Sequence, residues 1–505
     1  MKKILKIFSI HRVKILTLML TFAIAGCKYD GNPWDLADVN PEKYEGKADD
    51  GVIKILAIGN SFSENAIESN LYELAKQSDK TIIIGNLYIG GASLEMHKKN
   101  ALGKLYAYEY RKIDKQGNKK TYKTVSIDRA LEDEPWDYIS FQEASPNSGQ
   151  LEGVQASLPD LYNYVKAKAT NPNVKYVYHQ TWAYAQNSTY APFENYNKNQ
   201  LTMYNAIINV SQNVGNIVAL DMIIPAGTAI QNARTSQLGD GFTVADGYHL
   251  NEIGKYIAAC TWFEKIFGKS VVGNSYIGGF SAFEVLVAQN AAHLAVTKPN
   301  EITSMTSYEA QPVPLTSSVL VDFGNAALSP SWNQMSGYTV GSKINLKDSL
   351  NVFVGMALTV KERFNAINTD GAKVTAIPFL KMPENVSSRS FYGNSKTAFN
   401  SIVTPQGVIE ISGLLPTLTY NFSFFGSRAA TSATDNRETV YTLAGANSGS
   451  ASINTAGNSA NLATISNIKP NADGKVTLTV TSGAANNTAN GFYYLNAAKI
   501  TSNNN

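Results

Sequence analysis

The first half of the chain alternates short apolar runs with segments of helical period. The apolar runs that we expect to form strands are Ile53–Ile58, Thr81–Tyr88, Trp136–Gln142, Val174–His179 and Ile217–Asp221. Helical spacing of apolar residues lies between them, at residues 66–75, 158–165 and 203–210, and again after residue 249 and near 284–296. Parallel strands need crossover connections, which place helices on both faces of a sheet. The sequence therefore predicts an α/β domain at residues 51–296, with a β-hairpin insertion at Tyr106–Val125.

A second domain is expected after a proline-containing linker at residues 297–316. From residue 317 to 505 charge thins, Ser, Thr, Asn and Gly become frequent, and histidine and cysteine are absent. Short β-patterned runs separated by turn residues recur at Val319–Phe323, Val352–Val360, Val408–Ile411, Tyr420–Phe425, Thr439–Leu443, Val476–Val480 and Phe492–Ile500. This pattern predicts an all-β, jelly-roll-like sandwich, which by analogy with other appended sandwiches could bind carbohydrate.

Residues 1–26 have the pattern of a signal peptide. Basic residues precede and flank the apolar run Ile15–Ile24, and small residues come before Cys27. Ile24-Ala25-Gly26-Cys27 resembles a bacterial lipobox, in which the cysteine is acylated, so residues 27–50 are expected to be a tether. An ordinary signal peptide is the alternative, and the run is short for a transmembrane anchor. The sequence thus predicts export and lipid anchoring at the cell envelope, at the outer membrane.

Charge and cysteine content exclude several classes of partner and of covalent or metal cross-link. Five of the 43 basic residues lie in the leader, so the remaining chain has 38 basic and 40 acidic residues and no basic patch for nucleic acid. With Cys27 lipidated, Cys260 stands alone, which excludes an intrachain disulfide. No zinc or calcium motif occurs, and we expect no metal or other cofactor.

Two separated motifs indicate nucleophilic catalysis. Ser61 follows the strand Ile53–Ile58, while Asp246 precedes His249 by three residues. A serine hydroxyl needs an imidazole to take its proton, and the imidazole needs a carboxylate to fix its tautomer. Ser61 could instead be only a helix N-cap. The downstream Asp-x-x-His favours a catalytic triad of Ser61, His249 and Asp246.

The order of these blocks resembles the SGNH/GDSL hydrolase superfamily, and more closely an exported bacterial branch known as a domain of unknown function. The resemblance rests on Gly59-Asn60-Ser61-Phe62-Ser63, Gly90-Gly91, Gln142 and Asp246-x-x-His249. It implies a flavodoxin-like three-layer fold and an acyl-enzyme mechanism. It also implies an oxyanion hole built from Ser61 N–H, Gly91 N–H (rather than Gly90) and the Gln142 side chain.

The chain departs from the family pattern at two of these positions. Asn60 stands where the family usually has Asp, and Gln142 stands where it usually has Asn. The second departure resembles carbohydrate acetylesterases whose third block reads Gln-x-Glu-Ser.

Other polar and aromatic residues are candidate substrate contacts. Trp182 and Tyr184 could stack on a sugar ring, while His179 could line the site or be a structural histidine. His97 follows the glycine block and could line the pocket, and Asn60 lies next to the nucleophile.

The sequence thus predicts a serine esterase that removes O-acetyl or similar acyl groups from carbohydrate. The alternatives are a non-catalytic glycan-binding lipoprotein on the same scaffold and an esterase or lipase for small esters. A glycosidase using Glu64 or Glu143 is less favoured, because neither residue has an evident carboxylate partner.

Overall fold

The computed structural model describes residues 50–327, 329, 331–375 and 382–503. The predicted signal peptide, Cys27 and nearly all of the predicted tether lie outside these residues. No helix in the described ranges has the length and hydropathy required to cross a bilayer.

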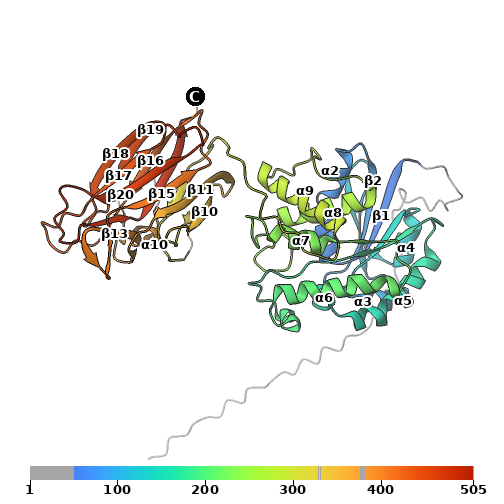
Figure 1. The fold of residues 1–505 in the computed structure, drawn as a ribbon. Coiled ribbons are helices and arrows are strands. Elements are labelled where there is room, and N and C mark those ends of the chain that lie inside the picture. Colours follow the sequence, from blue (N-terminus) through green and yellow to red (C-terminus); the bar gives the residue numbers. More distant parts are fainter. Residues whose placement is uncertain (1–49, 328, 330, 376–381, 504–505) are drawn as a thin grey trace, which may run out of the picture. The chain divides into compact units, whose positions relative to one another are not determined.

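The first domain is built on a seven-stranded sheet (Figure 1). Its strands are β1 (Val52–Gly59), β2 (Thr81–Tyr88), β3 (Tyr108–Ile113), β4 (Lys119–Val125), β5 (Tyr138–Phe141), β6 (Lys175–His179) and β7 (Met222–Ile224). The spatial order is β4-β3-β2-β1-β5-β6-β7, with β2, β1, β5, β6 and β7 parallel. Taken alone, these five strands have the flavodoxin-like order 2-1-3-4-5. The expected hairpin, β3–β4, extends the sheet antiparallel to β2.

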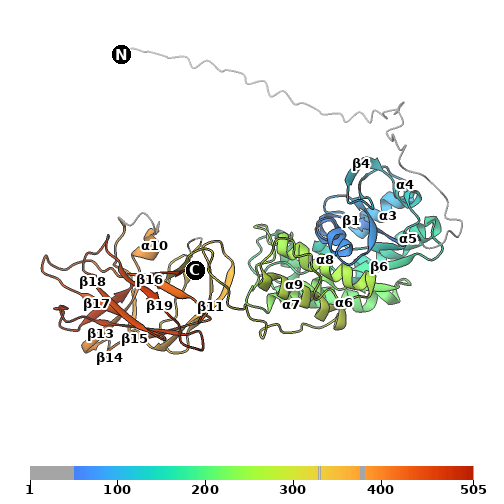
Figure 2. The same cartoon turned by 90° about the horizontal axis from the view of Figure 1, so that it is seen from above.

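Helices cover both faces of this sheet. One layer contains α3 (Leu94–Leu102), α4 (Ile127–Asp133), α5 (Leu151–Lys168) and α6 (Gln200–Asn213). The other contains α1 (Ser61–Ile67), α2 (Leu71–Lys76), α7 (Ala226–Arg234), α8 (Glu252–Phe267) and α9 (Ala282–Thr297). In Figures 1 and 2, α7, α8 and α9 lie together on one face of the sheet. Short 3₁₀ turns occur at Ser145–Asn147 (η1), Ala191–Tyr196 (η2) and Val214–Asn216 (η3). The predicted three-layer fold is therefore confirmed.

Two local predictions in this domain were wrong. The run Ile217–Asp221 is not a strand: α6 continues into the 3₁₀ turn η3, and the strand begins at Met222. The single helix expected at 66–75 is two helices, α1 and α2.

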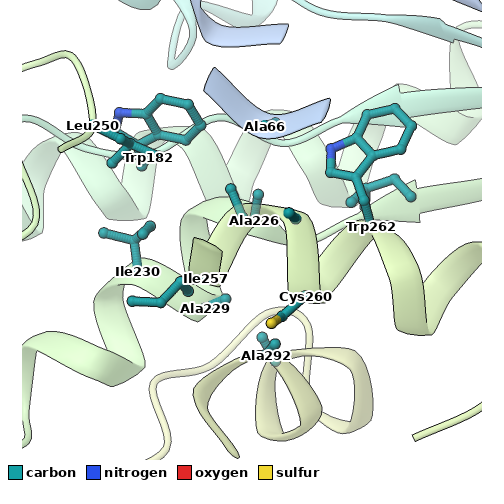
Figure 3. Close-up of a cluster of buried hydrophobic side chains, with 14 of the residues drawn as sticks. Ala66, Trp182, Ala226, Ala229, Ile230, Leu250, Ile257, Cys260, Trp262 and Ala292 are labelled. Carbon is teal, nitrogen blue, oxygen red and sulfur yellow. The ribbon is translucent and has the colours of Figure 1, made fainter. Parts of the chain in front are cut away.

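The largest core cluster of this domain lies under α7, α8 and α9. It includes Trp182, Cys260 and Trp262, all with fully buried side chains (Figure 3). Cys260 is unpaired, and burial raises the pKa of its thiol. It is therefore a small residue of the core rather than a reactive thiol.

The second domain is a β-rich sandwich. Its strands are β8 (Val319–Asp322), β9 (Asn333–Gln334), β10 (Lys343–Lys347), β11 (Phe353–Glu362), β12 (Ala366–Asn368), β13 (Ser390–Phe399), β14 (Ile402–Thr404), β15 (Gly407–Ser412), β16 (Thr419–Phe425), β17 (Glu438–Ala444), β18 (Ser448–Asn454), β19 (Ala463–Ile468), β20 (Val476–Ser482), β21 (Phe492–Leu495) and β22 (Ala497–Asn503), with one short helix, α10 (Glu384–Ser387). Sheets of order β10-β11-β15-β20-β17-β18 and β19-β16-β22-β8-β9 share one core, to which Ile409 and Tyr441 contribute from the first and Phe422 and Ile500 from the second. A third sheet joins β12, β13, β14 and β21.

The last run expected as one strand, Phe492–Ile500, is divided by a buried asparagine. Asn496 has no exposed surface, and its side chain accepts from Ser427 N–H at 2.7 Å and donates to the Ser387 carbonyl at 2.7 Å. Before it β21 pairs with β13, and after it β22 pairs with β16 and β8. The chain therefore crosses from one sheet to another at an asparagine whose side chain is held by two hydrogen bonds.

Candidate active site

The candidate nucleophile lies where β1 meets α1. Asn60 caps this helix, since its Oδ1 accepts a hydrogen bond from Phe62 N–H at 2.9 Å. Gly59 is required immediately before it, because a Cβ there would stand 2.5 Å from Ser63 Oγ and 3.1 Å from Gln142 Cδ. Ser61, the first residue of α1, is partly exposed at this carboxyl edge of the sheet.

Ser61, His249 and Asp246 form a continuous chain of hydrogen bonds. Ser61 Oγ lies 2.8 Å from His249 Nε2, and His249 Nδ1 lies 2.7 Å from Asp246 Oδ2. The serine and the histidine are 188 positions apart in sequence. This is the geometry in which imidazole can take the serine proton while the carboxylate holds the ring.

The Asp246 carboxylate is held by its own loop. Its Oδ1 accepts hydrogen bonds from the backbone N–H groups of Tyr248, at 2.9 Å, and His249, at 3.0 Å. Partial burial by itself raises the pKa of Asp246, but the hydrogen bonds from Tyr248 and His249 outweigh it and bring the pKa below its ordinary value. Asp246 therefore stays ionised at neutral pH.

Three groups that could stabilise an oxyanion lie around Ser61. Ser61 is the first residue of a helix, so its N–H has no intrahelical acceptor. Gly91 adopts φ +69°, a conformation that favours glycine, and its N–H donates no hydrogen bond within the described residues. Gln142, at the end of β5, is 1% exposed, and its Nε2 donates to Asn60 Oδ1 at 2.7 Å. That bond uses one of the two N–H groups of the amide.

His179 fixes which way the Gln142 amide points. Burial lowers the pKa of His179 to about 3, so the ring is neutral. Its Nδ1 lies 3.1 Å from Gln142 Oε1, which can only accept, so Nδ1 carries the proton. His179 thereby keeps the amide nitrogen of Gln142 directed toward Asn60. It is a positioning residue behind the site.

All five of the suggested substrate contacts are buried, and the structure corrects them. Trp182 has no exposed surface, because its ring stacks on Phe62 at 4.3 Å and its Nε1 donates to the Tyr248 carbonyl. Tyr184 is equally buried, with its hydroxyl bonded to Ser145. His97 is also fully buried; its Nδ1 lies 2.9 Å from the Tyr108 hydroxyl.

The fourth corrected contact is His179, which is 1% exposed and contacts Gln142. Asn60 is 2% exposed and bonds to Phe62, Gln142 and the Ala92 carbonyl. Asn60, the fifth of the suggested contacts, therefore holds neighbouring site residues in place and does not face a substrate.

The acidic residues considered for glycoside hydrolysis have structural partners. Glu64 forms an ion pair with Arg111 at 3.1 Å. Glu143 is buried, which raises its pKa, and its Oε1 accepts from the backbone N–H groups of Leu94 and Ala144. Glu143 therefore ties the start of α3, just after the glycine block, to the end of β5.

Two tyrosines near His249, one in contact with its ring and the other stacked on the first, were not anticipated. The Tyr248 ring lies 4.4 Å from the His249 ring, and it stacks on Tyr190 at 4.3 Å. Both tyrosines are partly exposed. Tyr248 lies inside the Asp-Gly-Tyr-His motif, which could have drawn attention to it, whereas nothing in the sequence connects Tyr190 to the site. Within the described ranges, no group of three or more His, Cys, Asp and Glu side chains could hold a metal ion.

Comparisons with known proteins agree with this fold. Residues 54–295 match the model of a family described as "Domain of unknown function (DUF4886)". A solved structure of a DUF4886 family protein from Bacteroides uniformis ATCC 8492 is 46% identical, covers 51% of this chain and 100% of that chain, and has a TM-score of 0.50.

Two more distant solved structures also match. A putative SGNH hydrolase from Slackia heliotrinireducens is 21% identical, with 43% of this chain and 99% of that chain covered and a TM-score of 0.29. A carbohydrate esterase family 3 protein from Talaromyces cellulolyticus is 12% identical, with 43% and 97% covered and a TM-score of 0.30. The comparison with curated proteins gave no match. The resemblance inferred from the motifs to a branch known as a domain of unknown function is confirmed by these DUF4886 matches.

Proposed function

This chain belongs to the DUF4886 family, and we propose that it is a serine esterase acting on O-acetylated carbohydrate. The observation that carries the proposal is the hydrogen-bonded sequence Ser61–His249–Asp246. An inert scaffold used only for binding would have no need of a correctly ordered nucleophile, base and carboxylate.

In the proposed mechanism Ser61 Oγ attacks the ester carbonyl carbon while His249 Nε2 takes the hydroxyl proton. The carbonyl oxygen becomes an oxyanion, stabilised by Ser61 N–H, Gly91 N–H and the remaining N–H of Gln142. Collapse of the tetrahedral intermediate breaks the ester C–O bond, and His249 gives its proton to the departing sugar oxygen. Water then attacks the acyl-serine, again with His249 as base, which releases the carboxylic acid and restores Ser61.

The choice of carbohydrate as substrate rests on the surroundings of the histidine and on the family resemblance. Tyr190 and Tyr248 are partly exposed beside His249, where an aromatic surface can pack against the C–H face of a sugar. They replace Trp182 and Tyr184 as the proposed substrate contacts.

Acetate release from a panel of acetylated polysaccharides tests this proposal. Acetylated xylan, glucomannan and pectin would be compared with p-nitrophenyl acetate, butyrate and octanoate, for the protein and for Ser61→Ala. Acetate release from a polysaccharide that is lost in Ser61→Ala supports the proposal. Turnover of the nitrophenyl esters alone would instead identify an esterase for small esters. Equal activity of the protein and Ser61→Ala on every substrate would exclude a serine esterase that uses Ser61.

We further propose that the protein is exported and lipid-anchored through Cys27, as the lipobox pattern predicts. Growth of an expressing bacterium with labelled palmitate should label the protein but not its Cys27→Ser variant. Equal labelling of the two would contradict the anchor.

A further inference from the structure

The third sheet of the second domain carries aromatic side chains on both faces. On one face Phe391, Tyr493 and Leu495 are part of the domain core. Side chains alternate along a strand, so the neighbours Tyr392 and Tyr494 point the opposite way, and the register pairs them directly across β13 and β21. The outward face of such a sheet is ordinarily polar. Its aromatic character therefore needs a separate explanation.

A cavity of about 470 Å³ opens on this outward face. Four aromatic residues line it: Tyr392, Phe399, Phe492 and Tyr494. Its volume is in the range of small-molecule sites, roughly 300–1,000 Å³. The cavity lies entirely within the second domain, and none of its lining residues belongs to the candidate active site.

The two phenylalanines of this cavity and Tyr392 meet edge to face, whereas Tyr392 and Tyr494 are tilted by 31°. Phe399 and Phe492 have ring centroids 5.0 Å apart at 86°, and Tyr392 lies 6.1 Å from Phe492 at 65°. In an edge-to-face contact one face of a ring is not covered by the other ring, so that face can contact a ligand. Phe399 is 40% exposed, near the end of β13, so it offers apolar surface to a ligand in the cavity.

Planar polar groups complete the lining. The Arg428 guanidinium pairs with the Asp370 carboxylate through Nη1, and no hydrogen bond within the described residues uses its Nε or Nη2. Asn368 lies beside them, with its Nδ2 bonded to Ser390. Planar groups with spare donors and acceptors can bind two neighbouring hydroxyls at once.

Charge at the cavity is balanced. Arg437 donates to the Tyr494 hydroxyl through Nη1 at 2.7 Å, and its Nε forms an ion pair with Asp435 at 3.0 Å. Arg428 is likewise matched by Asp370. Two guanidinium groups and two carboxylates leave no net charge, which favours a neutral ligand over a phosphate or an acidic sugar.

We propose that this cavity is a glycan-binding site that takes a neutral pyranose unit of a polysaccharide. The rings of Phe399 and Phe492 pack against the C–H surface of the sugar, above the buried Tyr392 and Tyr494, while Arg428, Asp370 and Asn368 bind its hydroxyls. The site is separate from the esterase chemistry and goes beyond the proposed function, because it would hold the protein on a glycan whether or not Ser61 acts on that glycan.

Affinity gel electrophoresis of the full chain tests the site. Gels would contain xylan, glucomannan, arabinogalactan or polygalacturonate, and migration would be compared for the protein and for Phe399→Ala and Arg428→Ala. Val340→Ala is the control, since Val340 is 65% exposed and does not line the cavity. Nitrophenyl acetate turnover, measured in parallel, should be the same in all four proteins.

At least one neutral polysaccharide should retard the protein. The dissociation constant should rise about tenfold in Phe399→Ala and in Arg428→Ala and remain unchanged in Val340→Ala. Three results would overturn the inference: no retardation by any neutral polysaccharide, equal retardation of protein and cavity variants, or retardation by polygalacturonate alone. Each differs from failure of the esterase proposal, which is read from turnover.

Discussion

The role of Gln142 can be tested by replacing it with leucine, which is similar in size but has no donor. In the protein one N–H of the Gln142 amide donates to Asn60 Oδ1 at 2.7 Å, and the other remains for an oxyanion. Removing one oxyanion donor costs about 10²–10³ in kcat, or about 3–4 kcal/mol of transition-state stabilisation. We expect this loss in Gln142→Leu, with little change in KM, because the interaction forms mainly in the transition state.

The substitution also has a structural cost, which needs a control. His179 Nδ1–H loses its acceptor inside the protein, at a cost of about 1–3 kcal/mol in the free energy of unfolding. Gln231→Leu is a matched change, since Gln231 is 4% exposed and its side chain bonds to Gln200 and Arg234, not to the site. It should lose similar stability but keep kcat within about threefold, the spread allowed for a structural change alone.

Steady-state kinetics on p-nitrophenyl acetate and urea unfolding of the same preparations supply both quantities. A Gln142→Leu protein that keeps kcat within about threefold of the wild type would refute the oxyanion role. An equal loss of kcat in Gln231→Leu would attribute the effect to general destabilisation instead.

Three further outcomes follow from the geometry. Asp246→Asn should lower kcat by about 10³–10⁴ with KM little changed, because the amide no longer fixes the productive imidazole tautomer; a loss below about tenfold in the same assay would argue against the triad. Gly91→Ala should reduce kcat, and it should lower the free energy of unfolding by about 1–2 kcal/mol, because φ is +69° there. Gly90→Ala should cost little, because Gly90 has no positive φ. Thermal melts that show an equal loss of stability in both variants would contradict this. Burial lowers the pKa of His97 from 6.5 to about 3. Between pH 6.5 and 5 this histidine therefore takes up a proton only in the unfolded chain, and it should lower the free energy of unfolding by about 2 kcal/mol over that range. Urea unfolding at pH 7 and 5 should therefore show a smaller drop for His97→Gln, and an unchanged drop would contradict the burial effect.

The triad was predictable because each part of it has a local signal. The Asp246–His249 contact lies within one loop of four residues. Ser61 follows a buried strand, and the carboxyl ends of parallel strands gather functional side chains at one edge. This general rule for parallel sheets therefore allowed the proximity of two residues 188 positions apart to be predicted.

The surroundings of the triad were not predictable in the same way. Trp182 and Tyr184 follow a strand that ends at this edge, but their burial depends on Phe62 and Ser145, which come from distant segments. The hydrophobic pattern and the residue propensities of a loop do not predict which of its side chains a distant helix will cover. The position of the partly exposed aromatic pair, Tyr190 and Tyr248, depends on tertiary packing for the same reason.

Predicted strand boundaries were wrong at places where hydrogen bonds, rather than hydropathy, determine the backbone conformation. The apolar residues after 216 follow a 3₁₀ turn, and pairing with β6 is prepared at Asp221, whose backbone N–H and side chain both bond to Tyr176. Likewise Asn496 interrupts an apolar run because its buried side-chain amide accepts one hydrogen bond and donates another inside the domain. Such partners lie far away in sequence and leave no periodic signal.

Covalent trapping of the nucleophile tests the central claim most directly. The protein would be treated with a fluorophosphonate that carries one alkyl ester, and the adduct would be located by peptide mass spectrometry. We predict one adduct, on Ser61, absent from Ser61→Ala and formed much more slowly in His249→Ala. An adduct on another residue, or labelling of Ser61 at an equal rate without His249, would contradict a serine activated by that histidine.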